Sequence, residues 1–169
     1  MDDAAIATLE VMLEDINVGC SVTPAEEFVT TLTSVLDPPA IGSPLRIEGV
    51  SLEEVPVEVK PTAAEMSAAT TGVTQGVLAI ASYGTIGIES TADGDELMSL
   101  FPPRQVAVVP ASCIHESMSA AFEWLSDAFA AGQDSIVFVT GNSATADMGA
   151  TVEGVHGPAE VHAVVVEDR

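Results

Sequence analysis

Side chains able to hold a small ligand concentrate in the segment 140-TGNSATADMG-149, which follows the apolar run 136-IVFV-139. Its first glycine permits a tight turn, and the residues after it carry an amide, hydroxyls and a carboxylate: Gly141, Asn142, Ser143, Thr145 and Asp147. Such a segment presents backbone N–H groups and side-chain donors to an anion without any lysine. The alternative is a helix start, with Ser143 or Thr145 as the cap and Asp147 in the first turn.

A second candidate segment, 83-YGTIGIES-90, follows the apolar run 77-VLAIA-81. Gly84 allows the backbone to approach a ligand closely, and Thr85 can hydrogen-bond it. Glu89 and Asp147 are the candidate catalytic groups, because a carboxylate among apolar residues acts as nucleophile or base with a raised pKa. The alternative for Glu89 is a solvent-exposed carboxylate at the end of a strand.

Histidine and arginine supply the remaining candidates. In 154-GVHGPAEVH-162, His156 and Gly157 precede a proline in a rigid turn, which favours contact of His156 with a ligand or a partner. His162 lies within the last apolar run and is expected to be a hydrogen-bonded strand histidine. Arg104 follows two prolines, and it can clamp a carboxylate or phosphate through two hydrogen bonds or form a structural ion pair.

Composition excludes several classes of function. The 169 residues include 26 Asp or Glu but only 4 Lys or Arg, for a net charge of −22, which disfavours binding to nucleic acids and to anionic membranes. Apolar residues make up 47%, so the chain is not a disordered acidic tail. An acidic surface around an apolar core is expected of a protein that folds in molar salt, where the Debye length is about 3 Å. An ordinary acidic protein is the alternative.

The cysteines and the N-terminus bear on metal binding and on cellular location. Cys20 and Cys113 are far apart and no CxxC is present, so no metal or iron–sulfur site is expected in this chain. The start, MDDAAIATLE, lacks the basic region of a signal peptide, and the apolar runs are too short to span a bilayer. A soluble, cytoplasmic protein without membrane insertion is expected.

The elements that must position these residues alternate between helix and strand. Amphipathic patterns and caps predict helices over 2–16, from Thr23 to before Asp37, over 63–69, near 96–100 and over 114–129. The last of these is expected to bury one stripe: Ile114, Met118, Phe122, Leu125 and Phe129. Strands are predicted at 56–59, 77–81, 85–90, 105–110, 136–139 and 161–167, and 38–54 is interpreted as a loop with short extended pieces.

This alternation predicts an α/β fold. Strands that are apolar on both faces belong to a mainly parallel sheet with helices on both faces. We expect one domain over 1–169, with N-terminal helices and a loop over 1–55 and the α/β core over 56–167. Ligands in such sheets bind beyond the carboxyl ends of the strands, so the candidate segments are expected to line one crevice there.

Four segments in this order and spacing, 84-GT-85, 102-PPR-104, 140-TGNSATAD-147 and 154-GVHGPAEVH-162, resemble the LUD domain of the lactate-utilization protein C family. The acid excess is similar to that of haloarchaeal members. The resemblance implies a NagB/RpiA/CoA-transferase-like fold. It also implies a role in oxidising L-lactate to pyruvate beside separate cysteine-rich and iron–sulfur subunits.

The resemblance thus predicts an accessory subunit that binds a small anionic ligand or an unidentified cofactor. The family commonly has Arg or Lys at the position of Ala144, so an anion site here depends on backbone groups, hydroxyls and Arg104. Two other functions stay open. One is an independent enzyme resembling CoA transferases or sugar-phosphate isomerases, with Glu89 or Asp147 in the chemistry. The other is a ligand-binding or assembly module without turnover. A homo-oligomer is compatible with each.

Overall fold

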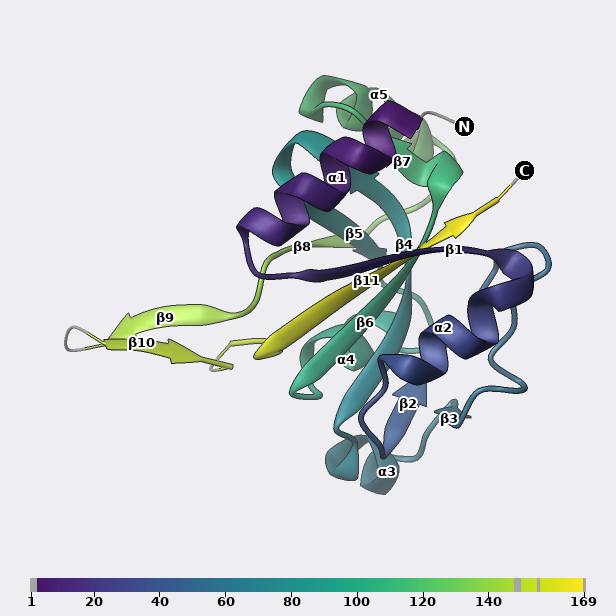
Figure 1. Cartoon of the computed structure of the whole chain (residues 1–169), viewed down its shortest axis with the longest axis vertical. Helices are drawn as coiled ribbons and strands as arrows, with labels where there is room; N and C mark the ends of the chain where they lie inside the picture. Colours follow the sequence, from purple (N-terminus) through teal and green to yellow (C-terminus); the bar gives the residue numbers. More distant parts are fainter. Residues whose placement is uncertain (1–2, 148–149, 155, 169) are drawn as a thin grey trace.

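A six-stranded parallel array forms the centre of the sheet in the computed structural model, which describes residues 3–147, 150–154 and 156–168, with only the backbone of 144–147 and 150–153. In spatial order the strands are β1 (Gly19–Pro24), β11 (Glu160–Glu167), β6 (Arg104–Pro110), β4 (Thr71–Ile80), β2 (Ala40–Gly42) and β3 (Val57–Val59). All neighbours in this order are parallel (Figure 1). The expected mainly parallel sheet is confirmed.

The second half of β4 extends the sheet with antiparallel strands. From Gly76 to Ile80, with a register shift between Gly76 and Leu78, β4 pairs with β5 (Thr85–Glu89), and β5 pairs with β8 (Ile136–Thr140). Strand β7 (Ile114–His115) runs parallel to the end of β4, which completes nine strands within the described residues. The strand expected at 77–81 in fact begins at Thr71, because its first five residues pair with the start of β6.

Helices cover both faces, as predicted. Alternate residues of β6 and β11 point to opposite sides of the sheet. Helix α1 (Asp3–Asp15) packs Leu9 and Leu13 onto the face that includes Ala107 and Val109. Helix α2 (Phe28–Ser34) packs its own apolar side chains onto the other face, against Val106 and Val108 (Figure 1).

The prediction that a helix starts at Thr23 is wrong at its first residues. Residues 19–24 form β1, which pairs along its whole length with β11 from His162 to Glu167. A short 3₁₀ turn at Ala25–Glu27 then leads into α2. Because β1 and β2 come from the first 55 residues, this region contributes strands to the central sheet and not only helices and a loop.

Three further helices connect the strands: α3 (Ala63–Ala68), α4 (Asp95–Leu100) and α5 (Met118–Ala130). The stripe predicted for the helix over 114–129 is only partly buried. Helix α5 starts after its Ser117 cap and buries Ala121 and Leu125, whereas Phe122 and Phe129 are 61% and 50% exposed. Within the described ranges, none of the helices combines the length and the apolar composition needed to cross a membrane.

The segment after β8 is a hairpin and not the expected loop or helix start. Strands β9 (Ala144–Asp147) and β10 (Ala150–Glu153) pair antiparallel, and the hairpin extends away from the central sheet (Figure 1). The side chains of Thr145 and Asp147 lie outside the described part of the chain, so their predicted ligand contacts and the catalytic role considered for Asp147 stay predictions.

Candidate functional site

Three of the four motif segments meet at the amino ends of β6 and β11. The Pro103 carbonyl accepts hydrogen bonds from the N–H groups of Ala159 at 2.8 Å and Glu160 at 3.1 Å. The N–H of Ser143 donates to the Pro158 carbonyl at 2.8 Å. The PPR, TGNS and His-Gly-Pro segments are therefore joined directly, although they are far apart in the sequence.

The polar residues of the TGNS segment are engaged in building this junction. The Ser143 hydroxyl accepts from the N–H of His156 at 3.2 Å, and the Asn142 side-chain oxygen accepts from the N–H of Val161 at 2.9 Å. A side chain on Gly157 would come within 3.4 Å of Ser143. These residues hold the bend that leads into β11, and so they set where Glu160 and the side chains after it lie.

The junction lies at the end of the sheet opposite to the one expected. The sequence argument placed the motifs beyond the carboxyl ends of the strands. They lie instead where β6 and β11 begin. The PPR and His-Gly-Pro segments directly precede these two strands, and the antiparallel strands β5 and β8 turn the chain back before the TGNS segment. The hydrogen bond from Val161, the second residue of β11, to Asn142 marks this end directly.

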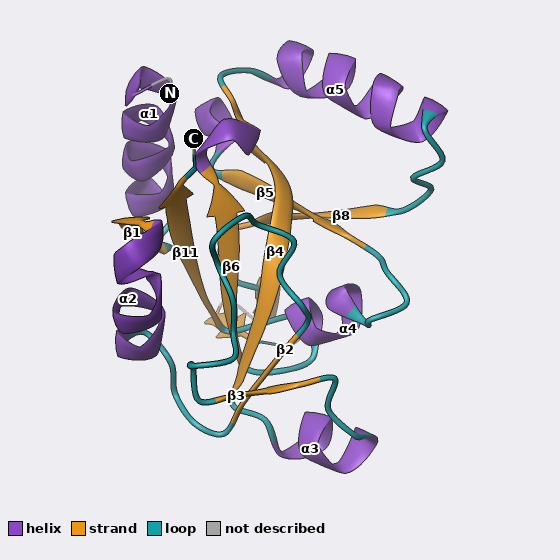
Figure 2. Ribbon diagram, turned by 90° about the vertical axis from the view of Figure 1, so that its right-hand side faces the viewer, coloured by secondary structure: helices purple, strands orange, loops and turns teal. Residues whose placement is uncertain are grey.

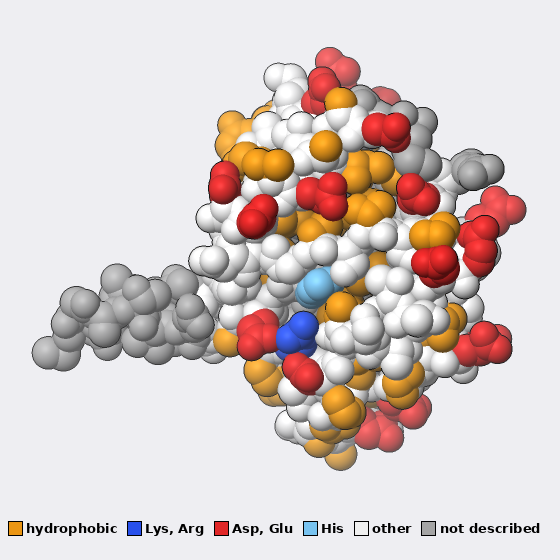
Figure 3. All heavy atoms as spheres, in the orientation of Figure 1, with side chains coloured by type: hydrophobic (Ala, Val, Ile, Leu, Met, Phe, Trp, Pro, Cys, Tyr) orange, Lys and Arg blue, Asp and Glu red, His pale blue; other side chains and the backbone are white. Residues whose placement is uncertain are grey.

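Arg104, the first residue of β6, carries the positive charge of this region. Its Nη1 donates to Glu160 at 2.5 Å and to Asp37 at 3.3 Å, and these two carboxylate side chains are 64% and 61% exposed. Figure 3 shows a basic side chain flanked by acidic ones on this face, with a histidine close by. The ion-pair interpretation of Arg104 is thus what the structure shows. Exposed pairs of this kind contribute only about 0–1 kcal/mol each.

His162 lies beside Arg104 on the same face of the sheet. Arg104 pairs in register with Glu160, and His162 is two residues further along β11 and on the same side. Its Nε2 is 2.9 Å from the Ser21 hydroxyl of β1, as expected of a hydrogen-bonded strand histidine. Burial, and next the Arg104 guanidinium, hold the pKa of His162 below its usual range, so its ring is neutral at pH 7.

We refer to Ser21, Arg104, Glu160 and His162 as the Arg104–His162 cluster. It presents a guanidinium, a hydroxyl and a neutral imidazole from three neighbouring strands, β6, β1 and β11. A guanidinium recognises a carboxylate, and a neutral imidazole nitrogen accepts a hydrogen bond from a hydroxyl. This combination of groups matches a small hydroxycarboxylate.

Acidification is expected to destabilise the fold through His162. Because its folded pKa is below the unfolded value of about 6.5, the unfolded chain binds more protons between these two values. The free energy of unfolding should therefore fall as pH drops below about 6.5, and His162→Gln should flatten this slope. Denaturant titrations at pH 7, 6 and 5 at constant salt measure it. His156→Gln, at an exposed histidine, is the control and should keep the slope of the wild type. A slope in His162→Gln equal to that of the wild type would contradict the prediction.

His156 and Gly157 lie apart from the Arg104 side chain. With Phe101 and other residues they line an open hollow of about 570 Å³: Leu100, Phe101, Pro103, Gly154, His156 and Gly157. Leu100 ends α4 and Phe101 follows it, and Met98 of the same helix lies against Gly72 of β4. The next residue of β4, Val73, points to the other face and packs with the apolar side chains of α2. The hollow therefore lies on the α4 side of the sheet and Arg104 on the α2 side.

A third group of predicted residues lies against the carboxyl end of α1: Gly84, Thr85 and Gly141. The Thr85 hydroxyl hydrogen-bonds the Thr140 hydroxyl at 2.7 Å, and Gly84 adopts a φ of 58° where a side chain would come within 3.1 Å of Ile16. Gly141 packs against the same helix end. The structure thus joins this group to the junction through residues 140–143 but does not place it in one crevice with His156.

Glu89, the other candidate catalytic carboxylate, ends β5. It pairs with Ile136 at the start of β8, while Thr85 at the other end of β5 pairs with Thr140, next to the junction. A strand of this length separates the two ends by about 13 Å. The placement agrees with the alternative interpretation, a carboxylate at a strand end.

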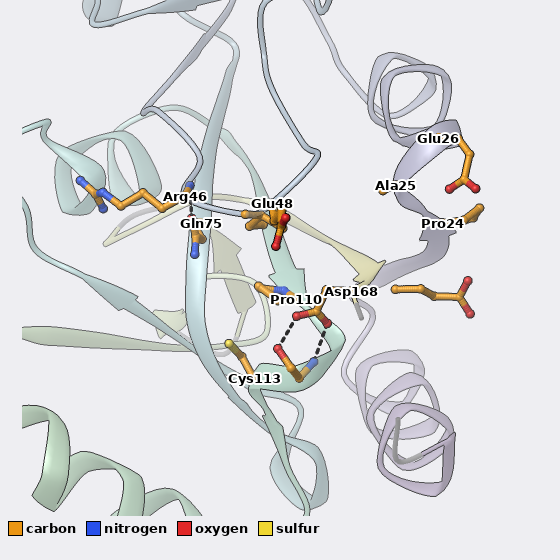
Figure 4. A pocket seen from close by; sticks show the side chains of 12 residues that line it. Pro24, Ala25, Glu26, Arg46, Glu48, Gln75, Pro110, Cys113 and Asp168 are labelled. Atoms are coloured by element: carbon orange, nitrogen blue, oxygen red, sulfur yellow. Dashed lines mark hydrogen bonds between the residues drawn. The ribbon is translucent and has the colours of Figure 1, made fainter.

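The carboxyl ends of the parallel strands open onto a different cavity of about 610 Å³ (Figure 4). Its lining includes the last residues of β1 and β6, Pro24 and Pro110, together with Cys113. The Asp168 carboxylate accepts hydrogen bonds from the Ser112 N–H at 2.8 Å and from its hydroxyl. The sequence analysis missed this cavity, although the ends of the runs 105–110 and 161–167 point to it.

This second cavity is unsuited to an anion. Four carboxylates line it: Glu26, Glu48, Glu167 and Asp168. The guanidinium of Arg46, which also lines it, is paired with Asp93 at 3.1 Å. Among the described residues no group of His, Cys, Asp and Glu is arranged to hold a metal ion.

Both thiols should be unreactive in the folded protein. Burial, and next the Glu10 carboxylate, raise the pKa of Cys20 to about 12, and burial raises the pKa of the cavity-lining Cys113. Since the thiolate is the reactive form, iodoacetamide at pH 8 should modify neither residue before unfolding and both afterwards, as measured by intact mass. Rapid modification of the native chain at Cys113 would contradict this.

Comparison with known proteins gives consistent results. The family model of the LUD domain matches residues 4–166. Lactate utilization protein C of Bacillus licheniformis is 37% identical over 102 residues, which are 58% of this chain and 42% of that protein. The Bacillus subtilis protein of the same name is 33% identical over 105 residues, 60% of this chain and 44% of that protein. The aligned part therefore spans less than half the length of either relative.

The fold also matches a solved structure. The crystal structure of a DUF162 family protein from Deinococcus radiodurans superimposes with a TM-score of 0.76 and covers 97% of both chains at 22% sequence identity. The likeness extends over β1 and β2 as well as the later strands, so the N-terminal region belongs to the shared α/β fold.

Proposed function

The chain belongs to the LUD-domain family, and from this membership we propose that it acts as an accessory subunit in the oxidation of L-lactate to pyruvate. The name of its curated relatives, lactate utilization protein C, supports the pathway. In this proposal the electrons pass to iron–sulfur and cysteine-rich partner subunits, and this chain binds the small organic acid.

We place the binding of that acid at the Arg104–His162 cluster. The observation that carries this assignment is the meeting of a guanidinium and a neutral imidazole at the junction of three motif segments. L-lactate has a carboxylate for Arg104 and a hydroxyl that would take the place of the Ser21 hydroxyl at the Nε2 of His162. The incoming carboxylate exchanges with that of Glu160, whose exposed ion pair with Arg104 is weak. Asn142, Ser143 and Gly157 hold the bend that positions Glu160 and His162.

Growth on L-lactate tests the role. Deletion of the gene should abolish growth with L-lactate as the carbon source while leaving growth on pyruvate intact. A copy of the wild-type gene should restore growth, a copy encoding Arg104→Gln should not, and one encoding Arg46→Gln should. Full growth on L-lactate without the gene would overturn the accessory role. Restoration by Arg104→Gln would overturn only the assignment of the site.

A further inference from the structure

The aromatic side chains of this protein are mostly on its surface. The sequence contains five phenylalanines and one tyrosine, and of these only Phe28 is buried. The others are between 44% and 61% exposed: Tyr83, Phe101, Phe122, Phe129 and Phe138. Exposed aromatic side chains that gather on one surface are typical of protein–protein interfaces.

Three of these aromatic residues line one uncharged hollow between α5 and β8. The hollow has a volume of about 370 Å³ and is lined by Tyr83, Thr85, Met118, Phe122, Phe138 and Thr140. The hydroxyls of its two threonines hydrogen-bond each other at 2.7 Å. The rest of the lining is aromatic or thioether surface, so the hollow favours apolar contact.

The strand beside this hollow has an open edge. β8 pairs with β5 on one side and with no other strand in the described part of the chain, and Figure 2 shows it beyond β5, below α5. Its sequence, IVFVT, contains no charge, proline or glycine. Native edge strands usually carry charged residues or proline, which prevent pairing with another strand, and β8 lacks both.

The distribution of charge favours a second copy of this chain as the occupant. Two chains with a net charge of −22 repel each other wherever carboxylates face one another. The β8 residues and the hollow lining carry no charge, and the α5 acids Glu123 and Asp127 lie about 100° and 140° around the helix from Phe122. A basic partner would gain nothing at this uncharged edge.

We propose that two copies of the chain pair antiparallel through the open edges of β8. A strand pairs with its own copy about a two-fold axis, and pairing along all five residues places Phe138 at that axis. Phe122 and Tyr83 of each copy then cover the other copy's β8. The Arg104–His162 cluster lies on the β1–β11–β6 side of the sheet, so the dimer leaves it open and does not depend on the proposed function.

Sedimentation equilibrium of the full chain in molar KCl tests the proposal. The wild-type chain should have twice the monomer mass. Phe138→Glu, which places two charges at the axis, and Phe122→Ser, which leaves β8 intact, should both have the monomer mass. Phe101→Ser is the matched control, because Phe101 and Phe122 are both 61% exposed and Phe101 lines the hollow next to α4. It should remain dimeric, and far-UV circular dichroism should show all four chains folded.

Three results would overturn the dimer. The first is a wild-type chain that stays monomeric up to its solubility limit. The second is a folded Phe122→Ser chain that keeps the dimer mass. The third is a loss of the dimer in Phe101→Ser but not in Phe122→Ser, which would place the contact at the α4 hollow. These results do not depend on the proposed function. If growth on L-lactate did not require the gene, the measured mass of the chain would test the dimer in the same way.

Discussion

Replacement of Arg104 by glutamine is expected to weaken the binding of L-lactate by roughly ten- to a hundredfold. A hydrogen bond to a charged group contributes about 1.5–3 kcal/mol, and each 1.4 kcal/mol is a factor of ten. Arg104 is the basic side chain at the junction of the motif segments, and the other described basic residues, Arg46 and Lys60, are both paired with Asp93. Isothermal titration at the lowest salt concentration that keeps the chain folded measures the loss.

Glu160→Gln should have the opposite effect. The Glu160 carboxylate occupies Arg104 in the free protein, so removing its charge removes a competitor for the ligand. Since exposed pairs contribute up to about 1 kcal/mol, the affinity should rise by up to about fivefold. Arg46→Gln is the charge-matched control for Arg104→Gln and should leave the affinity unchanged. A loss of affinity in Glu160→Gln would contradict the proposed competition between Glu160 and the ligand for Arg104.

Gly72→Ala is expected to cost about 3 kcal/mol of unfolding free energy, at the upper end of the range for overpacking. A β-carbon there would overlap the Met98 carbonyl oxygen of α4, which is backbone and cannot rotate away. The residue lies in the central strand β4, next to β6 and directly after Thr71, the partner of Arg104. The clash therefore separates α4 from the sheet. Denaturant titration in molar KCl measures the loss.

Gly49→Ala is the control for this substitution. Gly49 has a φ of 74°, and no atom lies within 4 Å of the place that a β-carbon would take. Alanine there costs only the left-handed backbone conformation, about 1–2 kcal/mol. Equal losses for the two variants would contradict the close contact between β4 and α4.

The fold class followed from particular apolar runs. Residues 105–110 and 161–167 are apolar on both faces, and they became β6 and β11 at the centre of the sheet. The motif segments were expected to meet beyond the carboxyl ends of the strands, whereas PPR and His-Gly-Pro each directly precede one of these neighbouring strands and meet at their amino ends. Arg104 was singled out as a candidate ligand group, beside the ion-pair alternative, because isolated cations stand out in a chain with 26 acidic residues.

The end of the sheet at which the TGNS segment lies could not be predicted from the sequence. An antiparallel pair such as β5 and β8 reverses the chain, and local residue patterns do not distinguish it from a parallel pair. Strand β1 was read as the start of a helix because Pro24 and Glu26 have the spacing of a helix start. Pairing of all its residues with β11 outweighs that local preference.

The buried stripe of α5 illustrates a second limit. Helical spacing places Phe122 and Phe129 close to Leu125 on one side, and a periodic pattern predicts that all three are buried. The part of the sheet next to α5 covers Ala121 and Leu125 and leaves both phenylalanines exposed. Periodicity shows which residues share a face, but it does not show whether that face meets the core or another chain.

A comparison of L-lactate with propionate, which lacks the hydroxyl, tests the Arg104–His162 cluster most directly. One neutral hydrogen bond contributes about 0.5–1.5 kcal/mol, so the wild-type chain should bind L-lactate about two- to tenfold more tightly than propionate. His162→Gln should bind L-lactate more weakly than the wild type does, while Asp168→Ala, in the cavity at the carboxyl ends, should retain the full preference. Equal affinity of the wild-type chain for both acids, or loss of the preference only in Asp168→Ala, would contradict the account.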